Sequence, residues 1–135
     1  MAADGLQDLA WHIWRAAPHL VSTDPSDGGK VYTPLNVILV TFDKDIKPGP
    51  NFNNISVTTD MEVRTTYNSV IGNSLQIVFS TIPITLADPE GVVWQVHLFR
   101  DAVTNVQGRP MGQDYHWSFT MLMAQYARMQ AVQNL

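Results

Sequence analysis

Residues 74–80 read SLQIVFS, and this stretch decides the fold class of the chain. Its apolar residues Leu75, Ile77 and Phe79 recur at every second position, which places them on one face of an extended strand. Gln76 and Val78, which stand between them, then face the opposite side together with the flanking serines. Such alternation is typical of antiparallel strands with one buried and one wet face, whereas parallel strands buried on both faces have continuous apolar runs. The stretch therefore predicts an antiparallel sheet that packs against a second layer.

The same pattern extends in both directions, over residues 18–120. Clusters of Gly, Pro, Asn and Asp interrupt it at fairly regular intervals, which is typical of a β-sandwich. The connecting segments lack the helical patterns that parallel crossovers require, and this argues against an α/β fold. A strand predicted at residues 61–67 places Val63 and Tyr67 on a common face. Seven strands are predicted, at residues 19–23, 36–43, 54–59, 61–67, 74–80, 92–100 and 115–120.

Large apolar side chains on the inward faces form the predicted core. Each large side chain that leaves water on folding contributes about 1.5–3 kcal/mol. Two sheets must pack these faces together, so the predicted fold is all-β, a seven-stranded antiparallel immunoglobulin-like sandwich. The predicted core residues are Ile38, Val40, Phe42, Leu75, Ile77, Phe79, Trp94, Val96, Leu98, Tyr115, Trp117 and Phe119.

Short helices are predicted at both termini. Leu6, Leu9 and Ile13 have the three-and-four spacing of one helical face, and Pro18 ends that run. The last segment has no Gly or Pro and is rich in good helix formers. We therefore divide the chain into an N-terminal amphipathic helix or linker (1–17), the sandwich (18–120) and a C-terminal helical tail (121–135). These helices pack on their own sandwich, meet a neighbouring domain or subunit, or fray.

Composition excludes several classes of protein. The chain has 135 residues, enough for one domain, and its 45% hydrophobic and 15% charged residues indicate a folded core. A net charge of −4 provides no basic surface for nucleic acid or anionic lipid. No stretch approaches the ~20 apolar residues of a membrane span. Because there is no cysteine, disulfides and thiolate metal sites are excluded. We expect neither nucleic-acid binding nor membrane insertion.

Two stretches carry a family resemblance: APHLVSTDPSDGGKVYTPLNVILVTFDKDIKPG (17–49) and RDAVTNVQGRPMGQDYHWSFT (100–120). They resemble the opening and the closing segments of bacterial Ig-like domains of the SbsA, or Big_5, type, which are found in S-layer and other surface proteins. Arg109 and Met121 depart from the family pattern, which has Asn and Thr there. The matching residues include Pro18, Asp27, Gly28, Pro34, Asn36, Phe42, Asp43, Asp101, Gly108, Asp114, Tyr115, Trp117 and Phe119. The resemblance implies a spacing, anchoring or adhesion module without catalytic residues.

Two groups of side chains are candidate metal ligands. His97 and His116 face outward on the sixth and seventh predicted strands, where a cross-strand pair would suit a divalent metal. The alternative for this pair is a solvated face. Aspartates in the end loops could supply oxygen ligands to calcium, or they could cap their own turns. The calcium candidates are Asp43, Asp45, Asp101 and Asp114.

Catalytic motifs are missing from the sequence. It contains no G-x-S-x-G nucleophile elbow, no phosphate-binding G-x-x-x-x-G-K loop and no evident pair of glycosidase carboxylates. We therefore predict that the protein is not an enzyme and uses no cofactor.

Two function classes remain, and both are non-catalytic. The leading prediction is a structural spacer of a larger surface or secreted protein, located outside the cell or at its surface. The N-terminus lacks the pattern of a secretory signal, so we expect the chain to be one domain of a longer protein. Its partners are then neighbouring domains of the same chain or surface proteins. The alternative is an adhesion module that binds protein or carbohydrate through end loops, strand edges or exposed helices.

Overall fold

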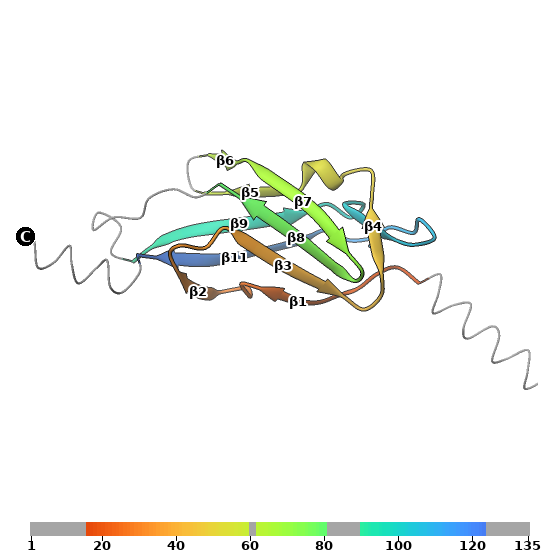
Figure 1. The fold of residues 1–135 in the computed structure, drawn as a ribbon, viewed down its shortest axis with the longest axis horizontal. Coiled ribbons are helices and arrows are strands. Elements are labelled where there is room, and N and C mark those ends of the chain that lie inside the picture. Colours follow the sequence, from red (N-terminus) through yellow and green to blue (C-terminus); the bar gives the residue numbers. More distant parts are fainter. Residues whose placement is uncertain (1–15, 60–61, 81–89, 124–135) are drawn as a thin grey trace, which may run out of the picture.

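The computed structural model describes residues 16–59, 62–80 and 90–123, and these are almost entirely β (Figure 1). A single 3-10 turn, η1 (Phe52–Asn54), interrupts the strands of this part of the chain. The strands are β1 (Leu20–Asp24), β2 (Gly29–Tyr32), β3 (Val37–Phe42), β4 (Ile46–Pro48), β5 (Ser56–Thr58), β6 (Val63–Arg64), β7 (Thr66–Ile71), β8 (Ser74–Phe79), β9 (Val92–Leu98), β10 (Val103–Asn105) and β11 (Tyr115–Leu122).

The strands form two main sheets and one small one. One main sheet has the order β1-β3-β8-β7, the other has the order β2-β11-β9-β5-β6, and β10 pairs with β4. The predicted all-β sandwich is confirmed. The prediction of seven strictly antiparallel strands was wrong, because the described residues contain eleven strands and β2 pairs with β11 in parallel. β2, β4 and β10 have only three or four residues each, too few to show a period in the sequence.

The predicted strand at 61–67 is two strands in different sheets. β6 belongs to the five-stranded sheet and β7 to the four-stranded sheet, so the chain changes layers at Thr65. The predicted common face of Val63 and Tyr67 was also wrong, since the two residues belong to different sheets, and they are 71% and 72% exposed. Hydrogen bonds hold this crossing: Arg64 Nε donates to the Ser80 carbonyl (3.0 Å), and the Ser80 amide donates to the Thr65 carbonyl (3.1 Å).

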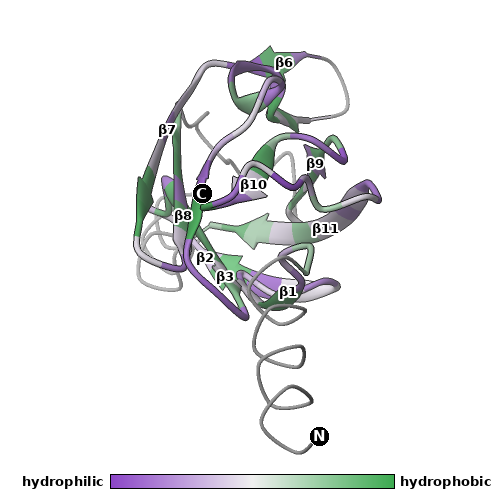
Figure 2. Ribbon diagram, turned by 90° about the vertical axis from the view of Figure 1, so that its right-hand side faces the viewer, coloured by the Kyte–Doolittle hydropathy of each residue, from purple (hydrophilic) through white to green (hydrophobic). Residues whose placement is uncertain are grey.

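A second crossing closes the opposite side of the sandwich. β1 lies at the edge of the four-stranded sheet, and β2, next in the chain, lies at the edge of the five-stranded sheet. Figure 2 shows the resulting two layers, with many hydrophobic residues on the strands and hydrophilic residues concentrated in the loops. The chain itself therefore joins the two sheets along both sides.

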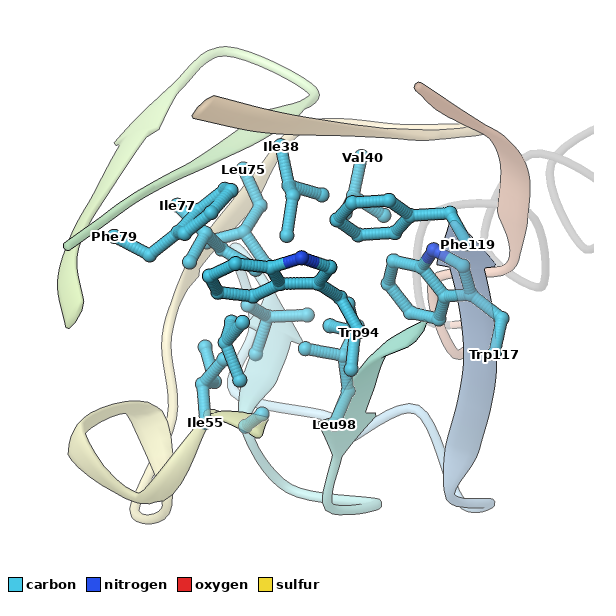
Figure 3. Packing of buried hydrophobic residues seen from close by; sticks show 14 of the residues in the cluster. Ile38, Val40, Ile55, Leu75, Ile77, Phe79, Trp94, Leu98, Trp117 and Phe119 are labelled. Carbon is cyan, nitrogen blue, oxygen red and sulfur yellow. The ribbon is translucent and has the colours of Figure 1, made fainter. Parts of the chain in front are cut away.

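Aromatic rings from the two sheets fill the core (Figure 3). Trp94 is fully buried; its ring lies 5.0 Å from that of Phe79 and stacks on that of Phe119 with an interplanar angle of 4°. The structure buries every predicted core residue except Tyr115, which is partly buried and packs against the cluster. Ile55 and Val57, which the predicted strand at 54–59 points inward, are buried as well, and the core also includes residues that were not predicted: Ile46, Ala102, Val103, Met111 and Met121.

The predicted terminal helices fall mostly on residues 1–15 and 124–135, which lie outside the described residues. The predicted start of the C-terminal helix at Met121 was wrong, because β11 continues to Leu122. Met121 is fully buried and pairs with Val92 of β9, so its burial in the sandwich decides its conformation. No helix within the described residues is long and apolar enough to cross a membrane.

The chain enters and leaves the sandwich at opposite ends. In Figure 1 the red segment before β1 lies at one end of the long axis, and the blue end of β11 lies at the other. We call these two ends the entry pole and the exit pole.

Candidate functional site

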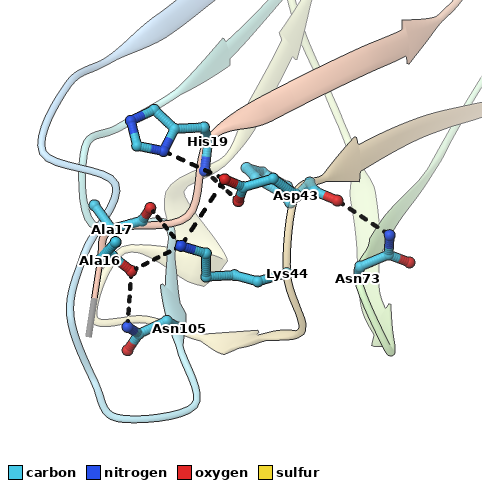
Figure 4. A network of polar contacts seen from close by, with 8 residues as sticks. Ala16, Ala17, His19, Asp43, Lys44, Asn73 and Asn105 are labelled. Carbon is cyan, nitrogen blue, oxygen red and sulfur yellow. Dashed lines mark hydrogen bonds and ion pairs between the residues drawn. The ribbon is translucent and has the colours of Figure 1, made fainter. Parts of the chain in front are cut away.

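Polar side chains fasten the incoming chain at the entry pole (Figure 4). Lys44 Nζ donates to the carbonyls of Ala16 (3.2 Å) and Ala17 (3.3 Å). Asn105 Nδ2 donates to the same Ala16 carbonyl (3.0 Å). The backbone amide of His19 donates to Asp43 Oδ1 (2.9 Å). We call Lys44, Asn105 and Asp43 the entry clamp, because they hold the backbone of residues 16–19 on the domain.

Burial and local hydrogen bonds fix the clamp in place. Asn105 is 1% exposed, and its Oδ1 accepts the backbone amides of Gln107 and Arg109, both at 2.9 Å. The Lys44 side chain is 20% exposed, and its ammonium lies 3.9 Å from Asp43 Oδ2. A buried amide with both ends hydrogen-bonded has little freedom to move. Because the Arg109 contact is through its backbone, the departure from the family's Asn at that position leaves the clamp intact.

The parallel pair β2–β11 runs toward the exit pole. Its register extends from Phe119 opposite Gly29 to Leu122 opposite Tyr32. Further backbone bonds flank it at both ends, from the Gly28 amide to the Ser118 carbonyl (2.7 Å) and from the Thr33 amide to the Leu122 carbonyl (2.9 Å). The last strand of the domain is thus bonded along its final half to one of the first strands.

The two predicted histidines meet on the outer face of the five-stranded sheet. His97 of β9 lies directly opposite His116 of β11, with ring centroids 6.0 Å apart and an interplanar angle of 81°. His97 Nε2 is 3.2 Å from Asp114 Oδ2, and His116 Nε2 is 3.2 Å from Gln95 Oε1. The sequence predicted this neighbourhood of imidazoles from the pairing of consecutive strands.

Asp114 is held from two directions. Its Oδ2 faces His97, and its Oδ1 accepts the Arg100 backbone amide (2.8 Å). The hydrogen bond with His97 and then that with the Arg100 amide lower the pKa of Asp114 below its ordinary value, because both stabilise the ionised carboxylate. This carboxylate therefore stays charged and fixes the orientation of the His97 ring.

The four candidate calcium aspartates do not converge. Asp43 caps His19, Asp114 caps Arg100, and Asp101 Oδ1 accepts the side-chain amide of Asn51 (2.6 Å). Asp45 lies beside the turn at residue 72. Within residues 16–59, 62–80 and 90–123, no group of three or more His, Cys, Asp and Glu residues could hold a metal ion. The hydrogen bonds to Asp43, Asp101 and Asp114 come from residues 24, 50 and 14 positions away in the chain, so these contacts join separate segments and are not the bonds to their own turns that the alternative interpretation expects.

Sequence reasoning missed Lys44 and Asn105. Lys44 stands between two aspartates directly after the predicted strand at 36–43, and Asn105 stands in the segment between the predicted strands at 92–100 and 115–120. Their shared acceptor, the Ala16 carbonyl, is 28 and 89 positions away in the chain, respectively. No local pattern in a single sequence reports contacts over such separations.

Apolar side chains are exposed on the four-stranded sheet and at its edge. Tyr67 and Ile71 of β7 are each 72% exposed, and Leu39 of β3 is 42% exposed. Tyr67 lies opposite Val78 of β8, which in turn lies opposite Val37 of β3, so a row of apolar residues crosses this sheet. Figure 2 shows the end of β7 coloured as hydrophobic.

Comparison with known proteins relates this fold to two solved structures and this sequence to one family. CopC from Methylosinus trichosporium OB3b has a similar structure, with a TM-score of 0.57 and 12% identity over 80% of this chain and 96% of that chain. PcoC, a methionine rich copper resistance protein from Escherichia coli, has a TM-score of 0.54 and 15% identity over 78% of this chain and 99% of that chain. At such identities the likeness shows the fold alone.

Among curated proteins, none matches this sequence. The sequence pattern of one family, however, spans residues 15–121, from the residue before the entry clamp's first acceptor to the buried Met121. The chain therefore belongs to the bacterial Ig-like domain family.

Proposed function

We propose that this domain is a non-catalytic spacer in a longer extracellular or surface protein, where it holds neighbouring domains apart and resists unfolding under tension. The observation that carries the proposal is the position of the entry and exit poles at opposite ends of the sandwich (Figure 1). A domain with this arrangement adds its full length to a chain.

The parallel pair β2–β11 supports a mechanical role. Tension pulls β2 through its N-terminal end toward the entry pole and pulls β11 through its C-terminal end toward the exit pole. Because the two strands are parallel, the pull is along them in opposite directions, and it loads all of their hydrogen bonds together. An antiparallel pair pulled from one end would instead lose its bonds one at a time.

The entry clamp adds to this resistance at the first described residues. Lys44 and Asn105 hold the Ala16 carbonyl, and Asp43 holds the His19 amide, so the incoming backbone meets the β3–β4 turn and the end of β10 before it reaches β1. A chain fastened in this way keeps its direction relative to the sandwich. The clamp therefore suits a rigid joint to a preceding segment.

Single-molecule force spectroscopy on the full chain tests the proposal. The chain has no cysteine, so handles can be attached through single cysteines introduced at chosen positions. Handles at the two chain ends load β2–β11 in shear. Handles at Glu90→Cys and Met123→Cys load the antiparallel pair β9–β11 from its open end, since Met121 pairs with Val92 there. We expect a higher unfolding force for end-to-end pulling.

A matched pair of variants isolates the parallel strands. Lys30 is exposed on β2, and Lys30→Pro removes a backbone donor and strains the strand, whereas Lys30→Thr keeps the donor. We expect Lys30→Pro to lower the end-to-end unfolding force and Lys30→Thr to leave it unchanged. Equal forces in both pulling directions, together with no effect of Lys30→Pro, would reject the spacer proposal.

A second candidate function, adhesion, is favoured by the apolar row on the four-stranded sheet. An exposed tyrosine beside aliphatic side chains suits a protein surface or the flat face of a sugar ring. Under this proposal Tyr67→Ser abolishes binding to a protein or glycan array without changing thermal stability. The spacer proposal predicts no reproducible ligand on either array.

A further inference from the structure

The outer face of the five-stranded sheet carries two imidazoles side by side. His97 and His116 are direct cross-strand partners on β9 and β11, which share the longest register among the described strands. His116 is exposed, and the His97 side chain is 32% exposed. The hydrogen-bonded pairing of β9 and β11 therefore fixes the backbone positions of both histidines, while their side chains remain accessible to solvent.

The distance between the rings suits a shared metal ion. A zinc–nitrogen bond is about 2.0–2.1 Å, so each ring centroid lies about 3 Å from a bound ion, and two rings at a tetrahedral angle have centroids about 5 Å apart. The observed separation is 6.0 Å. Metal binding therefore requires the His116 side chain, which is exposed, to rotate toward His97.

Hydrogen bonds prepare both rings as ligands. Asp114 accepts from Nε2 of His97, and Gln95 Oε1 faces Nε2 of His116, so the Nδ1 atom of each neutral ring keeps its lone pair. The Arg100 amide holds Asp114 in turn. A carboxylate on the far nitrogen of a ligating histidine orients the ring and strengthens it as a ligand.

We propose that His97 and His116 form a two-histidine site for a divalent transition-metal ion, with Asp114 as the positioning residue of His97. Imidazole favours copper, nickel and zinc ions, whereas calcium and magnesium prefer oxygen ligands. Water fills the remaining coordination positions. With two protein ligands, the site agrees with the lack of a three-residue group in the described part of the chain.

The chain offers its own comparison for this site. His19 Nδ1 lies 3.5 Å from Asp43 Oδ2, which makes a second pair of imidazole and carboxylate, at the entry pole. Among the described residues, no second imidazole ring packs against His19. If chelation by two rings is what binds the metal, the pair at the entry pole binds far more weakly than the pair on β9 and β11.

Isothermal titration of the full chain with zinc and with nickel ions tests the proposal, and NMR locates the site. We expect one saturable site, with nickel broadening the ring signals of His97 and His116 first. His97→Gln and His116→Gln should each remove it, and Asp114→Asn should weaken it about 10-fold or more. His12→Gln and His19→Gln are the matched controls and should leave the affinity unchanged, as should an excess of calcium.

Three outcomes would overturn the proposal. They are full affinity in His116→Gln, loss of the site in His19→Gln, and competition by calcium at equal concentration. Circular dichroism of each metal-free variant shows that a lost site is not a lost fold. Metal binding and the unfolding force are separate measurements, so the failure of this site leaves the spacer proposal standing, and the reverse also holds.

Discussion

Trp94 has the central position among the residues of the core. It is fully buried, lies against Phe79 and stacks on Phe119, so it joins the two sheets through their rings. Trp94→Ala removes these contacts and leaves a cavity, and we expect it to lower the free energy of unfolding by about 3–5 kcal/mol in urea titrations followed by circular dichroism. If that variant does not fold, Ile77→Val tests the same core at a cost of about 0.5–1.5 kcal/mol. Losses below about 3 kcal/mol for Trp94→Ala and below about 0.5 kcal/mol for Ile77→Val would contradict the central position of these side chains in the core.

Asp114 makes the stability of the fold depend on pH. Its folded pKa lies below its ordinary, unfolded value, first because of the His97 hydrogen bond and then because of the Arg100 amide. The carboxylate therefore stabilises the fold at pH values above its ordinary pKa, and this contribution disappears as the pH falls through the lowered value.

An NMR titration of the aspartate carboxyl carbons in chelator-treated buffer measures this shift. We expect His97→Gln to raise the pKa of Asp114 toward its ordinary value, but not fully, since the Arg100 amide remains as a donor. His19→Gln leaves the Asp114 environment intact and serves as the control. An unchanged pKa in His97→Gln would contradict the assignment of the main cause.

At the scale of elements, the entry clamp couples the segment before β1 to the β3–β4 corner. Lys44→Met removes a charged donor from two carbonyls, and hydrogen bonds of this kind contribute about 1.5–3 kcal/mol when buried. We expect a loss of about 1.5 kcal/mol, since the side chain is 20% exposed. Hydrogen exchange of the His19 amide should become faster, while exchange in β9 stays the same.

Lys47→Met is the matched control for this variant, because Lys47 is an exposed lysine three residues along the chain, on β4. It should leave the exchange of the His19 amide unchanged. Equal protection of that amide in both variants would show that the Asp43 contact alone holds the entering chain.

The sequence predicts some elements much better than others. β3, β8, β9 and β11 have six or more residues with regular alternation, so period two identifies both the strand and its buried face. The crossing from β6 to β7 was missed because a change of sheet leaves hydrophobic spacing almost unaltered. β2 was missed because its pattern is half-exposed and lies among turn residues.

For the molecule as a whole, the sequence predicted the two packed sheets better than the contacts between distant segments that join them. The proximity of His97 and His116 was predictable, since both lie on the outer face of adjacent strands whose alternation is evident in the sequence. The clamp at Ala16 was not, because it depends on how the end of β10 and the turn after β3 meet the segment before β1. Contacts between distant loops depend on the finished fold, and no period in the chain encodes them.

The two crossings between sheets also matter when many copies stand close together. The edge strands of the two main sheets are β1, β2, β6 and β7, and the longest of them has six residues. Short edge strands present few unpaired backbone N–H and C=O groups to a neighbouring copy, which limits strand pairing between copies when they are crowded. β7, with Tyr67 and Ile71 exposed, is the edge strand where fibril-like association would begin. A charged residue at either position should therefore raise the solubility of the domain.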